Sequence, residues 1–191
     1  SLHAQPWVSL APNLLGAQSS EMGAITHKAG ITWAGSHAVF MSLDSGISWT
    51  QRWTAPLGKD NIDDIVFYDT KIGLVCTHMG TVYRTDDQGL SWRIIHNLGA
   101  YSAAFIGSSD NIIVATGSCA TCATTEVTHD GGVTWKPQIQ GDWVPQVKAL
   151  LGGSAIAIAG TYLGGNTIIK TTDYGDSWKT LPGTFDLDAD A

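Results

Sequence analysis

Four aspartates with the chemistry of a cation site or of acid–base catalysis recur at a constant interval of 43 residues. Each stands in an octet of the form Ser/Thr-x-Asp-x-Gly-x-Ser/Thr-Trp. Such carboxylates could bind calcium or carry protons, but their identical setting favours a structural role. An Asp in a turn accepts backbone N–H groups, and Gly supplies a positive φ. We therefore predict four tight structural turns, with the fixed residues Ser42, Asp44, Gly46, Trp49, Thr85, Asp87, Gly89, Trp92, Thr128, Asp130, Gly132, Trp135, Thr171, Asp173, Gly175 and Trp178.

Other carboxylates and the histidines are candidates for catalysis and metal binding. A glycosidase needs two carboxylates on either side of a groove, and the candidates outside the octets are Asp60, Asp63, Asp64 and Asp142. The first three also suit a solvated turn before a strand. The six histidines form no His-x-His or His-x-x-x-His pair. We therefore expect no metal site and no cofactor.

The three cysteines are Cys76, Cys119 and Cys122. An odd number forbids complete internal pairing, and no second Cys pair completes a four-ligand zinc site. The flanks of Cys119 and Cys122 are typical of a loop between strands. We expect a local disulfide there if the protein is extracytoplasmic (secreted, periplasmic or lumenal), with Cys76 free on a buried strand. Inert thiols, or metal or redox chemistry, are the alternatives.

The elements that position these residues are short strands. Two β-rich runs precede each octet, a third enters it and a fourth leaves it, while no segment of ten residues has a helical apolar period. Each repeat of about 43 residues is therefore predicted to form a four-stranded antiparallel blade. The whole chain is predicted to be an all-β propeller or a section of one. The repeats run approximately over 11–53, 54–96, 97–139 and 140–183, and 184–191 is an acidic tail.

The octets resemble those of the Asp-box, or BNR, repeat family, which includes sialidases, sortilin-type receptors, xyloglucan-cleaving glycosidases and photosystem II assembly-factor-like propellers. The resemblance covers all four repeats. It implies that the octets join the two outer strands of each blade, away from the ligand face. A family sialidase would need three clustered arginines, whereas this chain has only Arg52, Arg84 and Arg93, two of them beside octets. The motif thus identifies the fold and leaves the activity open.

Charge narrows the range of partners. The 191 residues hold ten Lys+Arg against seventeen Asp+Glu, for a formal charge of −7. An acidic chain is a poor ligand for nucleic acid or an anionic membrane surface. No apolar run reaches about 18 residues, so we predict no membrane span.

Turns between second and third strands, and connections between blades, are predicted to open on the face opposite the octets. Aromatic and polar side chains on such turns could hold a protein or glycan. The candidate binding residues are His37, Arg52, Trp53, His78, Tyr101, Asp142, Trp143, Tyr162 and Asn166. Trp53 and Trp143 could instead cover the ends of the blade core. We predict a non-catalytic binding or assembly scaffold; the alternative is a glycoside hydrolase.

The number of blades is left open by the sequence. Trp7 stands 42 residues before Trp49, and the run from Pro6 to Leu10 resembles the fourth strand of an earlier blade. The chain could be part of a larger propeller, a closed four-bladed ring, or an arc completed by a second copy or another chain. An open arc would expose apolar sheet faces.

Overall fold

The computed structural model describes residues 23–56, 60–116, 123–140, 144, 146–160 and 166–185. Every regular element within these ranges is a β-strand. In chain order the strands are β1 Ala24–Lys28, β2 Ile31–Gly35, β3 Ala38–Ser42, β4 Thr50–Thr54, β5 Ile62–Phe67, β6 Gly73–Thr77, β7 Val82–Thr85, β8 Arg93–His96, β9 Ala100–Phe105, β10 Ile112–Thr116, β11 Ala123–Thr128, β12 Lys136–Gln140, β13 Gln146–Ala149, β14 Ala155–Gly160, β15 Asn166–Thr171 and β16 Lys179–Phe185.

The strands form four antiparallel meanders of four strands each, in which every strand pairs with its neighbours in sequence. We call these sheets blades 1 to 4. The prediction of four-stranded antiparallel blades is confirmed. The pairing of third with fourth strand shifts register in all four blades. Such irregularities increase the local twist, so each outer strand turns away from the first.

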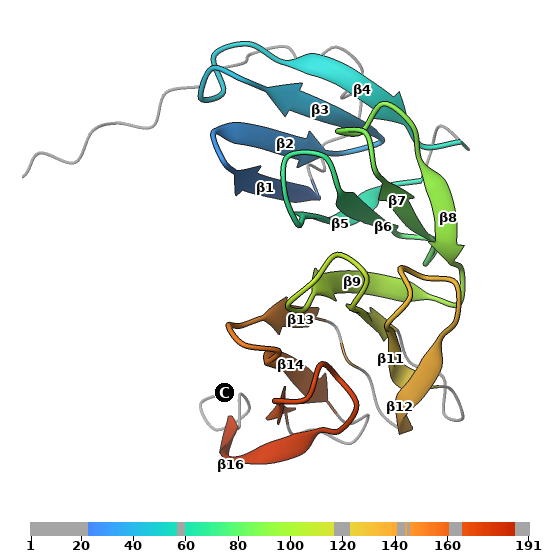
Figure 1. Cartoon of the computed structure of the whole chain (residues 1–191), viewed down its shortest axis with the longest axis vertical. Coiled ribbons are helices and arrows are strands. Elements are labelled where there is room, and N and C mark those ends of the chain that lie inside the picture. Colours follow the sequence, from blue (N-terminus) through green and yellow to red (C-terminus); the bar gives the residue numbers. More distant parts are fainter. Residues whose placement is uncertain are drawn as a thin grey trace, which may run out of the picture.

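The blades follow one another along an arc, with their first strands innermost (Figure 1). β1 packs beside β5, β5 beside β9, and β9 beside β13. Among the residues that the structure describes, three apolar cores fill the spaces between consecutive blades. In the first of these cores, Trp33 of blade 1 stacks on Phe67 of blade 2, with ring centroids 3.8 Å apart. The fold is therefore held by sheet faces packed against the next sheet.

Blades 1 and 4 lie at the two ends of this arc (Figure 1). In the described part of the chain, no strand of blade 1 packs along a strand of blade 4 as consecutive blades do. The described residues thus form an open arc, and not the closed four-bladed ring that the sequence allows as one alternative. Cys76 is buried on β6 with a free thiol, as predicted, whereas Cys119 and Cys122 lie outside the described residues.

Each octet forms the turn between the third and fourth strands, as the sequence predicts. In blade 1, Asp44 accepts hydrogen bonds from the backbone N and the hydroxyl of Ser48, at 2.8 and 2.6 Å. The Ser42 hydroxyl donates to Asp44 and accepts the N–H of Gly46, both at 2.8 Å. Gly46 has a φ of 90°. The other three octets repeat this pattern, which supports a structural role for the four carboxylates.

The octet tryptophans close the interfaces between blades. Trp92 packs against the core between blades 1 and 2, Trp135 against the next core, and Trp178 against the third. Each ring therefore lies on the side of its own blade that faces the preceding one. Trp135 also donates from Nε1 to the carbonyl of Ile95 in blade 2, at 2.8 Å. A helix able to cross a membrane is not found among the described residues.

Candidate functional site

Two loops of blades 2 and 3 meet at the end of the molecule away from the octets. The turn between β6 and β7 and the connection from β8 to β9 join where the Gly80 carbonyl accepts the N–H groups of Gly99 and Ala100, at 3.2 and 3.1 Å. A Cβ on Gly80 would lie 2.3 Å from the Gly99 Cα, and Gly80 has a φ of +79°. Glycine is required at this position because both the contact and the conformation exclude a side chain.

These joined loops expose two large apolar side chains. Met79 and Leu98 are each 70% exposed. The Met79 N–H donates to the carboxylate of buried Asp60 at 3.0 Å, and the Leu98 N–H donates to His96 Nδ1 at 3.3 Å. Both backbone positions are thus fixed by hydrogen bonds while their side chains face solvent. Because the backbone is already fixed, binding of a partner orders only the side chains and costs less entropy.

Polar groups lie beside the apolar pair. His78 Nδ1 is 3.3 Å from Asp63 Oδ2, and the His78 ring meets the Tyr101 ring edge-on at 6.3 Å. Burial raises the pKa of Asp63, the His78 charge opposes that shift, and the charges of Asp60 and Asp64 add to it. We call the group of Asp63, His78, Met79, Leu98 and Tyr101 the loop platform.

A buried histidine–glutamate pair underlies the loop platform. His96 Nε2 on β8 lies 3.3 Å from Glu126 Oε2 on β11, so the pair joins blade 2 to blade 3. The His96 ring also packs edge-on against Trp135 at 4.9 Å. Because His96 Nδ1 accepts the Leu98 N–H, the ring proton is on Nε2 and faces the carboxylate. Burial lowers the pKa of His96, although Glu126 acts in the opposite direction.

A cavity of about 550 Å³ lies between the first strands of all four blades. Its charged lining groups are Lys28, Asp64 and Lys148. Asp64 Oδ2 accepts the Ser102 hydroxyl at 2.7 Å and the Ala103 N–H at 3.3 Å. These bonds tie β5 to β9, so Asp64 is used in positioning the blades. Among the described residues, no group of three His, Cys, Asp or Glu is placed to hold a metal ion.

The structure brings only some of the predicted binding residues together. His78 and Tyr101 meet in the loop platform, and His37 lies on the corresponding turn of blade 1, where its carbonyl accepts the Ala55 N–H at 3.1 Å. Asn166 begins β15, but its side chain is not among those described. Asp142, Trp143 and Tyr162 lie outside the described residues.

Arg52 and Trp53 are placed differently from the sequence expectation of a loop between blades. Both lie on β4. The Trp53 ring packs against Tyr83 and Trp92 of blade 2, at 5.0 and 5.5 Å, and Arg52 Nε donates to the Gln88 carbonyl of blade 2 at 3.4 Å. The run continues the strand, so these side chains cover the blade core, which is the alternative stated above for Trp53.

The placement of Met79 and Leu98 on two loops that are joined through Gly80 is the feature that sequence reasoning misses. Both residues fall on loops predicted for this face, but single exposed apolar residues are ordinary. The available signal was the pair of glycines, Gly80 and Gly99, each next to one of the two side chains. Glycines allow two backbones to approach closely, but the sequence does not say that these two loops lie side by side. The glycines alone therefore could not predict the contact.

Comparison with solved structures identifies the fold. The chain is similar to YCF48 bound to D1 peptide, with a TM-score of 0.60 and 14% identity over 91% of this chain and 55% of that one. YCF48 from Cyanidioschyzon merolae matches with a TM-score of 0.59 and 17% identity, over 83% of this chain and 55% of that one. The GH74 enzyme of Niastella koreensis matches with a TM-score of 0.66 and 14% identity, over 83% of this chain and 30% of that one.

These similarities show a propeller fold that the chain shares with YCF48 and with a GH74 enzyme. The chain spans about half the length of the YCF48 structures it matches. No protein-family profile matches the chain, and no curated protein matches it in sequence. The comparisons therefore identify the architecture and leave the function to be argued from the site.

Proposed function

We propose that the chain is a binding scaffold whose loop platform holds an extended segment of a partner protein. The observation that carries this proposal is the pair of 70%-exposed side chains, Met79 and Leu98, on two loops joined through Gly80. Methionine and other large apolar side chains on a rigid frame are typical anchors for peptide ligands. YCF48, which has a similar fold, is seen with a peptide bound.

The surroundings of the two anchors define the chemistry of the partner. Asp63 offers a partly buried carboxylate beside them, and the whole chain carries a formal charge of −7. His78 and Tyr101 add ring edges and a hydroxyl. The ligand expected here is a peptide with an aliphatic or aromatic residue next to Lys or Arg, because such a segment matches both the apolar and the acidic parts.

The test uses peptides selected from a random display library on the intact chain. We expect enriched sequences to pair an apolar residue with a basic one, and Leu98→Asp to weaken their binding about tenfold or more, measured by calorimetry. Leu90→Asp is the matched control, because Leu90 is 62% exposed but lies in an octet at the other end of the blade. Equal losses in the two variants would show that the peptides do not bind at the loop platform.

Glycoside hydrolysis is the second candidate, and Asp63 is the observation that favours it. A carboxyl group whose pKa is raised by burial suits a general acid. However, the hydrogen bonds of Asp60 and Asp64 commit those two carboxylates to the fold. Release of reducing sugar from polysaccharides by the wild type, lost in Asp63→Asn with fold and peptide binding unchanged, would favour the hydrolase over the scaffold.

A further inference from the structure

The outward face of blade 4 carries apolar side chains at the end of the arc. On this face, Ile158 is 41% exposed and Leu181 is 37% exposed, while Ile156 and Ile168 are half-buried. Ile158 and Ile168 are directly paired between β14 and β15. We call these four residues, together with Lys170 and Lys179 beside them, the last face.

The same positions are buried where a following blade is present. Counted from the octet and its strand pairing, Ile156, Ile158, Ile168 and Leu181 correspond to Leu74, Cys76, Val82 and Ile95 of blade 2. Those four residues are at most 7% exposed and belong to the core between blades 2 and 3. The last face thus repeats the apolar pattern of an interior blade-to-blade interface.

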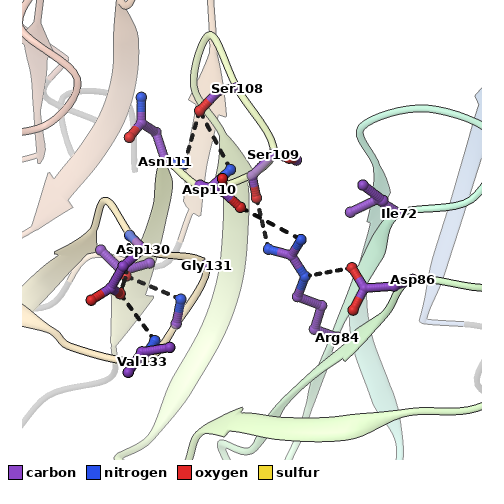
Figure 2. A network of polar contacts seen from close by, with 12 residues as sticks. Ile72, Arg84, Asp86, Ser108, Ser109, Asp110, Asn111, Asp130, Gly131 and Val133 are labelled. Atoms are coloured by element: carbon purple, nitrogen blue, oxygen red, sulfur yellow. Dashed lines mark hydrogen bonds and ion pairs between the residues drawn. The ribbon is translucent and has the colours of Figure 1, made fainter.

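Cations add a second, independent pattern. At the blade 2–3 interface, Arg84 donates to the Ser109 carbonyl at 2.7 Å and lies 3.8 Å from Asp110 (Figure 2). Arg93 of blade 2 also donates to the Gly131 carbonyl of blade 3, at 3.5 Å. Arg52 reaches from blade 1 to blade 2, and Lys136 reaches from blade 3 to Asp176 of blade 4, at 3.5 Å. Each described interface therefore has a cation directed forward onto the next blade.

Lys170 and Lys179 hold the corresponding positions on blade 4. Lys170 directly precedes its octet, as Arg84 does, and Lys179 directly follows the octet Trp, as Arg93 and Lys136 do. The two lysines face each other across the β15–β16 pairing, where like charges repel. Among the described residues, neither lysine forms an ion pair. An acidic or carbonyl-rich surface placed over them would remove this repulsion.

We propose that the last face is a docking surface for a further four-stranded blade of the same octet class. This blade would cover Ile158 with apolar side chains of its first two strands. Its turn between those strands would present carbonyl or Asp groups to Lys170, as residues 108–111 do to Arg84, and its octet would present a carbonyl to Lys179. The inference is independent of the loop platform and of the proposed function.

A second copy of the chain fits this surface less well. On blade 1, the residues that correspond to the blade-facing Val75 and Tyr83 of blade 2 are Ala34 and Phe40, which are already 0% and 3% exposed. On that side Ile25, which pairs with Ala34, is 69% exposed, so the described residues of blade 1 offer a smaller apolar surface than the last face. Two last faces packed against each other would bring four lysines together. The charge pattern thus favours a blade that is not a copy of blade 1 or blade 4.

Blade 3 provides a matched probe, because it covers the equivalent face of blade 2. A second copy of residues 97–140 would be inserted after residue 185, ahead of residues 186–191. We expect hydrogen exchange of the β14 and β15 amides to slow roughly tenfold relative to the unfused chain. Ile158→Lys should abolish this protection in the fusion and shift the melting midpoint of the unfused chain by no more than about 2 °C.

The controls keep the proposal falsifiable. Leu151→Lys adds the same charge at a 94%-exposed turn position and should leave the protection intact. A second fusion, with a copy of residues 54–96, guards against failure of one added repeat to fold. Unchanged exchange of β14 and β15 in both fusions would overturn the proposal. An unfused dimer that Ile158→Lys dissociates would overturn it in favour of a second copy.

Discussion

The two ends of each blade differ in how closely they repeat. At the octet end, the four turns share the same hydrogen bonds from the same residue types. At the loop end, the turn of blade 1 presents His37, whereas that of blade 2 presents His78 and Met79 and is locked to the next connection through Gly80. Identical bonding in every blade marks a structural requirement, and variation on a fixed frame is where recognition can develop.

The largest effect is expected at the loop end, where backbone meets backbone. Gly80→Ala places a Cβ 2.3 Å from the Gly99 Cα at a positive φ. It should lower the free energy of unfolding by about 3 kcal/mol, through steric overlap and backbone strain. Chemical denaturation measures the loss.

The matched control is Gly30→Ala. Gly30 has a φ of +83°, but a Cβ at this position would meet no described atom within 4 Å, so only the strain of about 1–2 kcal/mol applies. Equal losses in the two variants would mean that the Gly80–Gly99 contact does not hold the two loops together.

The next effect concerns the octet end. Thr128 is buried, and its hydroxyl donates to Asp130 at 2.6 Å and accepts the Gly132 N–H at 3.1 Å. Thr128→Val keeps the side-chain shape but removes the hydroxyl, so the Gly132 N–H and the Asp130 carboxylate each lose a partner. This should lower the free energy of unfolding by about 1–3 kcal/mol. Peptide binding at the loop platform should not change. A loss of binding without a loss of stability would contradict the structural role of the octets.

The octet end and the loop end should also lose stability in different pH ranges. Hydrogen bonds from Ser48 and Ser42 lower the pKa of Asp44 to about 2, and those from Ser177 and Thr171 do the same for Asp173. A lowered carboxyl pKa stabilises the fold above the ordinary value near 4, and this contribution is lost as pH falls towards about 2. The octet turns should therefore weaken in that range.

At the loop end, the group concerned is His96. Burial lowers its pKa, so the folded state favours the neutral ring and loses stability as pH falls below the ordinary value of about 6.5. The protection factor of the Leu98 amide against hydrogen exchange should fall in this range, at a higher pH than that of octet amides such as Ser48. His96→Gln should remove the first transition and leave the second. A single transition near pH ~3 for both amides would remove this distinction.

The smallest effect on stability is expected from the side chains that we assign to recognition. Met79→Ala and Leu98→Ala remove exposed groups, so each should change the free energy of unfolding by no more than about 0.5 kcal/mol. Thermal unfolding measures the change in stability of each variant, and calorimetry measures its change in peptide affinity. A large stability loss in either variant would place that side chain in the fold instead of the binding surface.

The octet end could be predicted from the sequence because the Asp and hydroxyl hydrogen bonds that define each turn join residues of a single octet. Asp44, Ser42 and Gly46 contact one another locally, and four copies confirm the pattern. The loop platform could not be predicted in the same way. Gly80 meets Gly99, and His96 meets Glu126, only after two blades have packed, and neither pair repeats elsewhere in the sequence. Trp53 shows the same limit, since its partners Tyr83 and Trp92 belong to the next blade.

The three separate cores have a consequence for how the arc unfolds. Each core joins only neighbouring blades, so the arc is one-dimensional in the sense used for repeat proteins, and its stability is approximately a sum of single-blade and nearest-neighbour contributions. A blade at an end has one described neighbour, whereas blades 2 and 3 have two. A stretching force applied to such an arc would remove end blades first, and the extension would rise in steps of one repeat.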